Sequence, residues 1–374
     1  MIYLDSAATT RPYDEVIEVV ADTMRNHYGN ASSIYEFGKQ SLDIITQVRQ
    51  QFAEDLNCDV EDIIFTSGAC EANSMVINHC KKVDGVLITS RLEHKSIELG
   101  AQTCVARYVQ NDKYGMVDIQ DLESILKSIP QHKPKIVSIC AANSEIGTIQ
   151  DIKKISDRVH KFGGIFHCDA TQLFPYERID MKSLGIDMLS LSAQKFHGPK
   201  GIGILTCHIE DITCMIYGSQ ESYRRGGTYN TPLIAGMGMA LKMLDRTKAD
   251  VFRKYTYEIW NELSQQNVKL VGHPIAKRLP NHLALYVPRA KADDIISIAD
   301  VLGVCISAGS ACNSGNPVPS QSLMAIGMDY RKTQSIIRIS VDDLLTWGEV
   351  TTACRILKQA VTWAKLRSIN DEEW

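Results

Sequence analysis

Residues 151–170, DIKKISDRVHKFGGIFHCDA, decide the fold because they contain a helix and the strand that follows it. The apolar side chains of the first half recur at helical spacing: Ile152, Ile155, Val159 and Phe162. Asp151 stands where a helix N-cap belongs, and Gly163 can take the left-handed conformation that ends a helix. The apolar run 164–170 is too short for a second helix and predicts a buried strand.

Short apolar runs of the same kind occur on both sides of this stretch and predict further strands: DIIFTS (62–67), GVLITS (85–90), KIVSICAA (135–142), DMLSLSA (187–193) and GIGILTC (201–207). They alternate with amphipathic segments, and strands connected through helices form parallel sheets. We therefore predict an α/β domain with a mostly parallel sheet. In such sheets, ligands bind at the carboxyl ends of the strands.

The C-terminal part of the chain predicts a second, smaller α+β domain. One long helical segment begins at Pro232, extends to residue 266 and is expected to carry the chain out of the large domain. Strands are predicted near HLALYV (282–287) and IIRISV (336–341).

The composition is that of an ordinary globular protein: 374 residues, 44% hydrophobic and 22% charged, with a formal net charge of −4. No long basic or acidic run is present, so neither nucleic acid nor an anionic membrane is expected as a partner. The N-terminal residues lack the apolar region of a signal peptide, and no apolar run is long enough to cross a bilayer. We expect a cytoplasmic protein.

The 11 cysteines are scattered without a CxxC pair, so we expect free thiols rather than a zinc or thioredoxin-type site, and no metal. Cys312 differs from the others because it lies in GSACNSG (309–315), among residues too small to bury it. Structural cysteines usually lie among larger apolar side chains. Cys312 is therefore either a reactive thiol or an exposed inert one, and the heptapeptide alone leaves both interpretations open.

Three predicted strands end in residues that suit a bound cofactor. The turn SGACE (67–71) leads into a helix and is either an anion site or a plain tight turn. Asp169 closes a buried strand, where a carboxylate meets a cation or serves as a structural hydrogen-bond acceptor. Lys195 is either a surface lysine or, if desolvated, an amine suited to a Schiff base. Together, a phosphate turn, an acid for a pyridine nitrogen and a lysine for an aldehyde match pyridoxal 5'-phosphate.

A series of motifs in one order makes the chain similar to the cysteine desulfurases, within the class V aminotransferase-fold enzymes. The motifs are YLDSAATT (3–10), GNASSIYEFG (29–38), FTSGACEAN (65–73), EHKS (93–96), NSEIGTIQDI (143–152), FHCDATQ (166–172), SAQKFHGPKGIG (192–203), RRGGTYNTPLIAG (224–236), SAGSACNSG (307–315) and IIRIS (336–340). The resemblance implies the type I fold of pyridoxal phosphate-dependent transferases. Its large domain (15–255) would hold a mostly parallel seven-stranded sheet, and its small α+β domain (1–14 and 256–374) would carry the Cys312 loop.

The resemblance also implies a role for each matched residue around the cofactor. Lys195 matches the lysine that holds the aldehyde, and Asp169 matches the partner of the pyridine nitrogen. His94 matches the imidazole that stacks on the ring and moves protons, and Gln172 matches the donor to the phenolic oxygen. The phosphate-binding positions are Ala69, Cys70, Ser192 and Gln194, joined by Thr228 from the neighbouring subunit of a homodimer.

The same resemblance implies how a substrate is handled. Arg338 matches the arginine that binds the carboxylate of L-cysteine, a bidentate task suited to guanidinium, and Ser144 occupies a second substrate-binding position. Cys312 matches the nucleophile, which attacks the substrate sulfur as a thiolate and leaves L-alanine and a persulfide. Gly309 and Gly315 would give its loop the freedom to deliver sulfur to an acceptor protein, a scaffold for iron–sulfur assembly or a thiolation enzyme.

Several positions depart from the family pattern. Cys70 replaces a threonine, Gln194 replaces the histidine before the lysine, and Ser144 replaces an asparagine. Asn143 is not expected to substitute for Ser144 if the segment is extended, since alternate side chains then point opposite ways. Asp342 and Asp343 place acid where a basic residue is typical.

Besides a desulfurase activity, the sequence leaves two other functions open. One is a divergent pyridoxal phosphate lyase or aminotransferase acting on another amino acid, which Cys312 argues against and Ser144 leaves possible. The other is a degenerate, non-catalytic binding partner, which the retained Lys195, Asp169 and Arg338 argue against.

Overall fold

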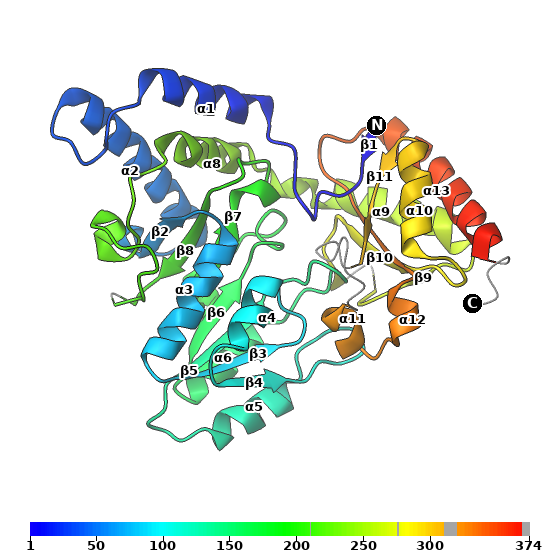
Figure 1. Cartoon of the computed structure of the whole chain (residues 1–374), viewed down its shortest axis with the longest axis horizontal. Helices are drawn as coiled ribbons and strands as arrows, with labels where there is room; N and C mark the ends of the chain where they lie inside the picture. Colours follow the sequence, from blue (N-terminus) through cyan, green and yellow to red (C-terminus); the bar gives the residue numbers. More distant parts are fainter. Residues whose placement is uncertain (210, 275–276, 310–319, 369–374) are drawn as a thin grey trace.

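The computed structural model describes residues 1–209, 211–274, 277–309 and 320–368. Its larger part is built on a seven-stranded sheet with the order β2-β8-β7-β6-β5-β3-β4 (Figure 1). The strands are β2 (Ile63–Thr66), β3 (Val86–Ser90), β4 (Ala106–Val109), β5 (Lys135–Cys140), β6 (Ile165–Asp169), β7 (Met188–Ser192) and β8 (Gly203–Cys207). Only β8 runs antiparallel to its neighbours. The predicted mostly parallel sheet is confirmed, although β4 was not predicted.

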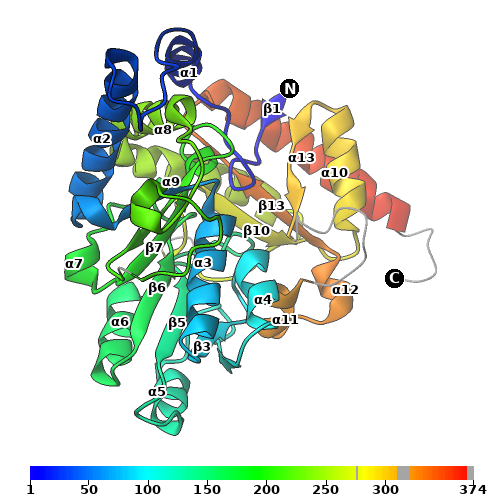
Figure 2. The same ribbon diagram turned by 60° about the vertical axis from the view of Figure 1, so that its left-hand side comes forward.

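Helices cover both faces of this sheet (Figure 2). They are α1 (Asp14–Asn26), α2 (Glu36–Leu56), α3 (Ala69–Lys82), α4 (Lys95–Ala101), α5 (Ile119–Ser128), α6 (Ile152–Lys161), α7 (Met181–Leu184) and α8 (Thr231–Met243). Successive strand residues enter different cores: Ile88 and Val137 pack in one cluster, and Leu87 and Ile136 in the other. Both faces are therefore buried, which explains why the strand sequences are apolar throughout.

The helix quoted at the outset forms as predicted. Asp151 caps α6 by accepting a hydrogen bond from the Lys154 backbone N–H (3.2 Å), and Gly163 takes a left-handed φ of 66° after the helix ends. Strand β6 follows directly and places Asp169 at its carboxyl end.

The smaller part contains a four-stranded antiparallel sheet with the order β12-β13-β10-β9. Its strands are β9 (Lys269–Leu270), β10 (His282–Tyr286), β12 (Ser307–Ala308) and β13 (Ile336–Ser340), and its helices are α9 (Ala249–Ser264), α10 (Ala292–Val301), α11 (Gln321–Ala325), α12 (Tyr330–Thr333) and α13 (Trp347–Ser368). The N-terminal strand β1 (Ile2–Tyr3) pairs with β11 (Val304–Cys305), so the first residues lie beside this part of the molecule (Figure 1).

The predicted single helix from Pro232 to residue 266 is wrong. Helix α8 ends at Met243, and Leu244 is extended. The Asp245 side chain then caps a short 3-10 turn before α9 begins. The predicted domain boundary at residue 255 falls inside α9, which packs against α13. No helix within the described residues is long and apolar enough to cross a membrane.

Candidate active site

A cavity of about 390 Å³ lies where the carboxyl ends of the sheet strands meet the smaller part of the chain. It brings together ten of the predicted site residues: Ala69, Cys70, His94, Ser144, Asp169, Gln172, Ser192, Gln194, Lys195 and Arg338. Thr228 lines a different cavity. Cys312 falls within 310–319, outside the described residues.

The turn at the start of α3 presents backbone to this cavity. Gly68 has a φ of +148° that favours glycine, and no described side chain caps the helix at that end. A Cβ on Gly203 would come within 2.6 Å of the Gly68 Cα, so only glycine lets β8 approach the turn this closely. A 14-residue helix that begins at a cavity without a side-chain cap offers its N–H groups and dipole to an anion such as a phosphate.

Lys195 follows β7 in a short 3-10 turn, η2 (Ala193–Lys195). Its ammonium Nζ donates to the carbonyl oxygens of Ala7 (2.6 Å) and Ala8 (2.7 Å). Gln172 Nε2 donates to the same Ala7 oxygen (3.0 Å). The N-terminal segment therefore forms one wall of the site and holds the lysine head group inside the cavity.

Asp169 lies at the end of β6 and is only 5% exposed. Its Oδ1 accepts from the Thr171 backbone N–H (3.1 Å), and its Oδ2 accepts from Asn73 Nδ2 (2.8 Å). The hydrogen bonds to this carboxylate thus come from neutral donors, and it lines the cavity. A buried anion of this kind suits a protonated ring nitrogen.

The sequence did not indicate Asn73. It is fully buried on α3, between the core residues Ala72 and Met75. An amide in an otherwise apolar helix face was the available signal, since a buried polar side chain requires a partner.

His94 precedes α4 and lines the same cavity. Burial lowers the pKa of its imidazole, the Asp169 charge raises it, and Lys195 and Lys95 lower it further. The ring nitrogen Nδ1 accepts from the Ser96 backbone N–H (3.2 Å) and lies 2.9 Å from Ser96 Oγ. The net effect favours the neutral imidazole.

Glu93, next to His94, is a buried acid behind the cavity. Its Oε1 accepts from Ser90 Oγ (2.7 Å) and its Oε2 accepts from the Cys140 N–H (2.7 Å). Burial raises the pKa of Glu93 to about 8, the hydrogen bonds from Ser90 and Cys140 lower it, and the Asp169 charge raises it further. A protonated Glu93 avoids placing a second buried anion close to Asp169.

Arg338 reaches the cavity from β13 and is 3% exposed. Its Nη2 donates to Asp5 Oδ1 (2.8 Å) and its Nη1 donates to the Ser144 carbonyl oxygen (3.2 Å). Asp5 also accepts from Ser307 Oγ (2.6 Å). Arg338 Nε is buried without a partner among the described residues. Asp5 lies in YLDSAATT, but the sequence did not indicate its contact with Arg338.

The segment around Ser144 is a turn, so the condition of an extended segment, on which the expectation for Asn143 rested, is not met. Asn143 Oδ1 accepts from the N–H groups of Glu145 and Ile146 (both 2.8 Å), and its Nδ2 donates to the Leu92 carbonyl (2.6 Å). These bonds occupy the Asn143 side chain, and Ser144 is the neighbour that lines the cavity.

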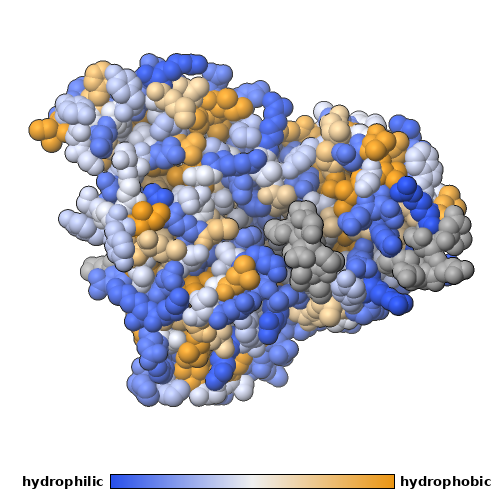
Figure 3. Space-filling view, viewed as in Figure 1, coloured by the Kyte–Doolittle hydropathy of each residue, from blue (hydrophilic) through white to orange (hydrophobic). Residues whose placement is uncertain are grey.

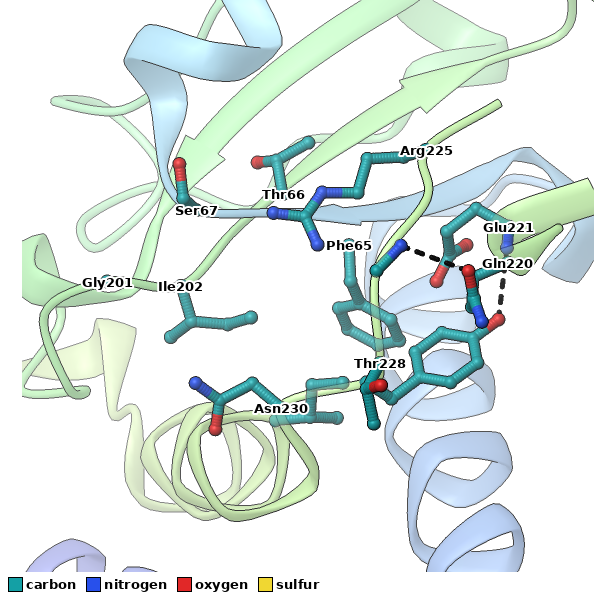
Figure 4. A pocket seen from close by; sticks show the side chains of 13 residues that line it. Phe65, Thr66, Ser67, Gly201, Ile202, Gln220, Glu221, Arg225, Thr228 and Asn230 are labelled. Carbon is teal, nitrogen blue, oxygen red and sulfur yellow. Dashed lines mark hydrogen bonds between the residues drawn. The ribbon is translucent and has the colours of Figure 1, made fainter. Parts of the chain in front are cut away.

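A second cavity, of about 300 Å³, adjoins the first and shares Ser67 and Gly201 with it (Figure 4). Thr228 and Arg225 extend towards it from the segment before α8. Arg225 Nε pairs with Glu71 Oε1 (2.9 Å) at the first turn of α3. Thr228 therefore lines the second cavity of its own chain and does not line the first.

The cavity residues fit pyridoxal 5'-phosphate. The uncapped start of α3 suits the phosphate, Asp169 suits a protonated pyridine nitrogen, and the Lys195 amine, which lines the same cavity, suits an aldehyde. Ser192 and Gln194 add neutral donors beside the turn.

Known proteins resemble this chain over nearly its whole length. Residues 2–351 match the family described as aminotransferase class-V. A cysteine desulfurase IscS of Methanosarcina thermophila is 32% identical over 384 residues, which cover 99% of this chain and 93% of the relative. A NifS-like protein from Rickettsia africae is 29% identical with a TM-score of 0.89, covering 97% of this chain and 99% of the other. The structure titled SspA in complex with cysteine is 28% identical with a TM-score of 0.81, covering 91% and 99%.

Proposed function

The chain belongs to the class V aminotransferase family, and from that premise we propose that it is an L-cysteine desulfurase. It would convert L-cysteine to L-alanine and leave the sulfur as a persulfide on Cys312. The observation that carries the proposal is the meeting of Asp169, Lys195, His94 and Arg338 in one cavity. The relatives of this name and the cysteine complex of a related structure support it.

Pyridoxal 5'-phosphate is the cofactor of this family, and when bound it withdraws electrons from the substrate Cα. Lys195 would hold its aldehyde carbon and Asp169 its ring nitrogen, with Gln172 beside the phenolic oxygen. The backbone of Ala69 and Cys70, with Ser192 and Gln194, would bind the phosphate. His94 would stack on the ring and hold a proton at one of its nitrogens.

Arg338 would bind the substrate carboxylate. Asp5 and the Ser144 carbonyl already orient the guanidinium, which lines the cavity. Because the group is buried, a carboxylate partner would be worth more there than at the surface. Ser144 lines the cavity and would add a hydroxyl contact to the substrate.

The thiolate of Cys312 would attack the substrate sulfur. The bond between Cβ and sulfur breaks, its electron pair stays on carbon, and a proton completes L-alanine. The new sulfur–sulfur bond is the persulfide on Cys312. Support for this residue comes from its place in SAGSACNSG. The persulfide would then pass to an acceptor protein, either a scaffold for iron–sulfur assembly or a thiolation enzyme.

The working unit would be a homodimer. Thr228 lies in the adjoining cavity rather than in the cofactor cavity, which suits a residue that serves the partner's phosphate. Exposed large side chains also occur where α1 ends and α2 begins: Met24, Tyr28, Ile34, Tyr35 and Phe37. In Figure 3, apolar and polar side chains are mixed at this end of the molecule. Large exposed side chains of this kind suit burial against a second copy. The ten described cysteines form no disulfide with one another, which supports a reducing, cytoplasmic location.

The test is stoichiometric alanine release from L-cysteine by the cofactor-loaded protein. Cys312→Ala should abolish both persulfide and sulfur transfer, whereas the control Cys305→Ala should retain them. Full sulfur transfer by Cys312→Ala would refute the nucleophile. Amino-group exchange without alanine from cysteine would favour an aminotransferase, and failure to take up the cofactor would favour a non-catalytic partner.

A further inference from the structure

A chain of hydrogen bonds connects Asp169 to His94 through two residues that have no assigned role. Asn73 Nδ2 donates both to Asp169 Oδ2 (2.8 Å) and to Ser96 Oγ (2.9 Å). Ser96 Oγ in turn lies 2.9 Å from His94 Nδ1. The three connecting contacts join β6, α3 and the first turn of α4.

The orientation of Asn73 follows from its partners. An ionised carboxylate only accepts hydrogen bonds, so the amide must turn its nitrogen towards Asp169. The opposite atom, Oδ1, is buried without a partner among the described residues. Leaving a buried carbonyl unpaired is unfavourable. The hydrogen bonds from Nδ2 to Asp169 and Ser96 therefore outweigh the cost of the unpaired Oδ1.

The direction of the next bond follows in the same way. Ser96 Oγ accepts from Asn73, so its single O–H is left to donate to His94 Nδ1. The backbone N–H of Ser96 points at the same nitrogen (3.2 Å). With two donors directed at it, Nδ1 must present its lone pair. The neutral ring then carries its proton on Nε2, the nitrogen that remains for the cavity.

We propose that Asn73 and Ser96 are positioning residues that hold His94 neutral, with its proton on Nε2, and tie the ring to the carboxylate of Asp169. The charged groups that face His94 are Asp169 from β6, Lys195 from η2 and Lys95 from α4. The two lysines oppose a cationic ring, and the Ser96 donors oppose a proton on Nδ1. Any proton that His94 exchanges with the cofactor or substrate is therefore carried on Nε2. This role in proton transfer rests on the proposed function.

The test is the tautomer of His94 in the cofactor-free protein, read from nitrogen-15 NMR of histidine-labelled samples. His94→Gln identifies the signal by its loss. The wild-type ring should show protonated Nε2 and unprotonated Nδ1. A ring protonated on Nδ1 in the neutral state would overturn the proposal without any variant.

Ser96→Ala should raise the pKa of His94 and mix the two tautomers, because one of the two donors to Nδ1 is lost. Ser96→Thr keeps the hydroxyl and should restore the wild-type signal. Asn73→Ala should raise the pKa in the same direction. Asn281→Ala is the matched control, since Asn281 is also buried, bonds through Nδ2 and has no Oδ1 partner within the part of the chain that the structure describes. Its Nδ2 donates to Ser6 Oγ and the Val341 carbonyl rather than to Asp169 and Ser96. Unchanged His94 signals in Ser96→Ala and Asn73→Ala would refute the proposal.

Turnover separates this inference from the proposed function. In cofactor-loaded protein, Ser96→Ala should release alanine about 10-fold more slowly and shift the pH profile, a smaller loss than the roughly 10²- to 10⁴-fold contributed by an acid–base catalyst itself. If wild-type protein releases no alanine, the desulfurase proposal fails while the NMR result still stands. If alanine is released but Ser96→Ala leaves the rate, pH profile and tautomer unchanged, the positioning role fails alone.

Discussion

The two ends of the cofactor cavity are built by different means. At the ring end, Asp169 is buried and bonded to Asn73, and a protonated Glu93 lies behind it. At the phosphate end, the side chains are the neutral Ser192 and Gln194 and the exposed Cys70. The ring end therefore relies on a buried charge with a specific partner network, whereas the phosphate end relies on a helix start and uncharged donors.

This difference assigns separate tasks to the two ends: the ring end determines the reaction rate, and the phosphate end determines the affinity for the cofactor. A charge in a buried, preorganised site acts strongly on a developing charge nearby. Neutral hydrogen bonds contribute about 1 kcal/mol each, and the loss of two or three lowers affinity by about 10- to 100-fold. Two of the departures from the family pattern, Cys70 and Gln194, lie at the phosphate end, and none replaces Asp169, His94 or Lys195, so we expect weaker retention of the cofactor with the ring chemistry intact.

The largest effect is expected at the ring end. Asp169→Asn removes the charge opposite the ring nitrogen and should lower alanine release by about 10²- to 10³-fold, as loss of a preorganised electrostatic group does. The rate is measured with the bound cofactor quantified by its absorbance. Asp151→Asn, which alters a helix cap away from the cavity, is the control. Equal rates for Asp169→Asn and wild type would show that the ring end does not carry the chemistry.

A second, smaller effect concerns the substrate anchor at the mouth of the cavity. Arg338→Lys replaces a planar fork with a single ammonium group and should lower kcat/KM by about 10- to 100-fold, mainly through KM. Asp5→Asn should lower kcat/KM by a smaller factor, because the Ser144 carbonyl still orients the Arg338 guanidinium. Arg246→Lys is the matched control, since Arg246 forms a bidentate pair with Asp55. An unaltered KM in Arg338→Lys would contradict its role as the carboxylate anchor.

The ring end was also the more predictable from sequence. Asp169 and Lys195 follow short apolar strands, and the order of strands and helices places their ends at one edge of the sheet. Their positions therefore depend on local patterns and a general rule of parallel sheets. Strand β4 (ARYV) was missed because three of its four residues are only partly buried or exposed, so the apolar signal is weak.

Contacts between distant segments were not predictable in this way. Asp5 meets Arg338 across 333 positions, and Asn73 meets Asp169 across 96. The turn at Asn143 depends on the Leu92 carbonyl, and the break after Met243 depends on the cap from Asp245. Of the two acids that depart from the family pattern, Asp343 also makes contacts with distant segments, because it accepts from Tyr13 and Lys248 (both 2.8 Å). No periodicity in the chain encodes such pairs.

The acid behind the ring end should make stability depend on pH. Burial raises the pKa of Glu93 from 4.5 to about 8, so the folded protein binds a proton that the unfolded chain releases between those values. Proton binding by Glu93 therefore contributes to the free energy of unfolding. That contribution is complete below about pH 4.5 and is lost as the pH rises through about 8. Glu93→Gln mimics the protonated acid and should gain on the order of 2 kcal/mol relative to wild type between about pH 6 and pH 9.

The measurement is chemical denaturation of the cofactor-free protein at several pH values. Glu15→Gln, which removes an exposed charge from α1, is the control for loss of a glutamate. Parallel pH profiles for Glu93→Gln and wild type would show that Glu93 is ionised in the folded protein. Two ionised, buried carboxylates would then be present at the ring end. The two ends of the cavity would differ more in charge, but the ring end would not make the free energy of unfolding depend on pH through Glu93.

The smallest effect tests the phosphate end by restoring what the family usually has there. Cys70→Thr adds a hydroxyl donor at the start of α3, and one neutral hydrogen bond should tighten cofactor binding about 5-fold. Gln194→His should add a similar factor if the imidazole is protonated. Binding is measured by titrating cofactor-free protein, with Cys305→Thr as the control for loss of a thiol. Tighter binding with an unchanged turnover number would show that the phosphate end sets the cofactor affinity without affecting the reaction rate. Weaker binding in Cys70→Thr would instead show that the cysteine already suits this site. The second result would mean that the phosphate end differs from the family pattern without being weakened, and cofactor retention would then depend on the helix start alone.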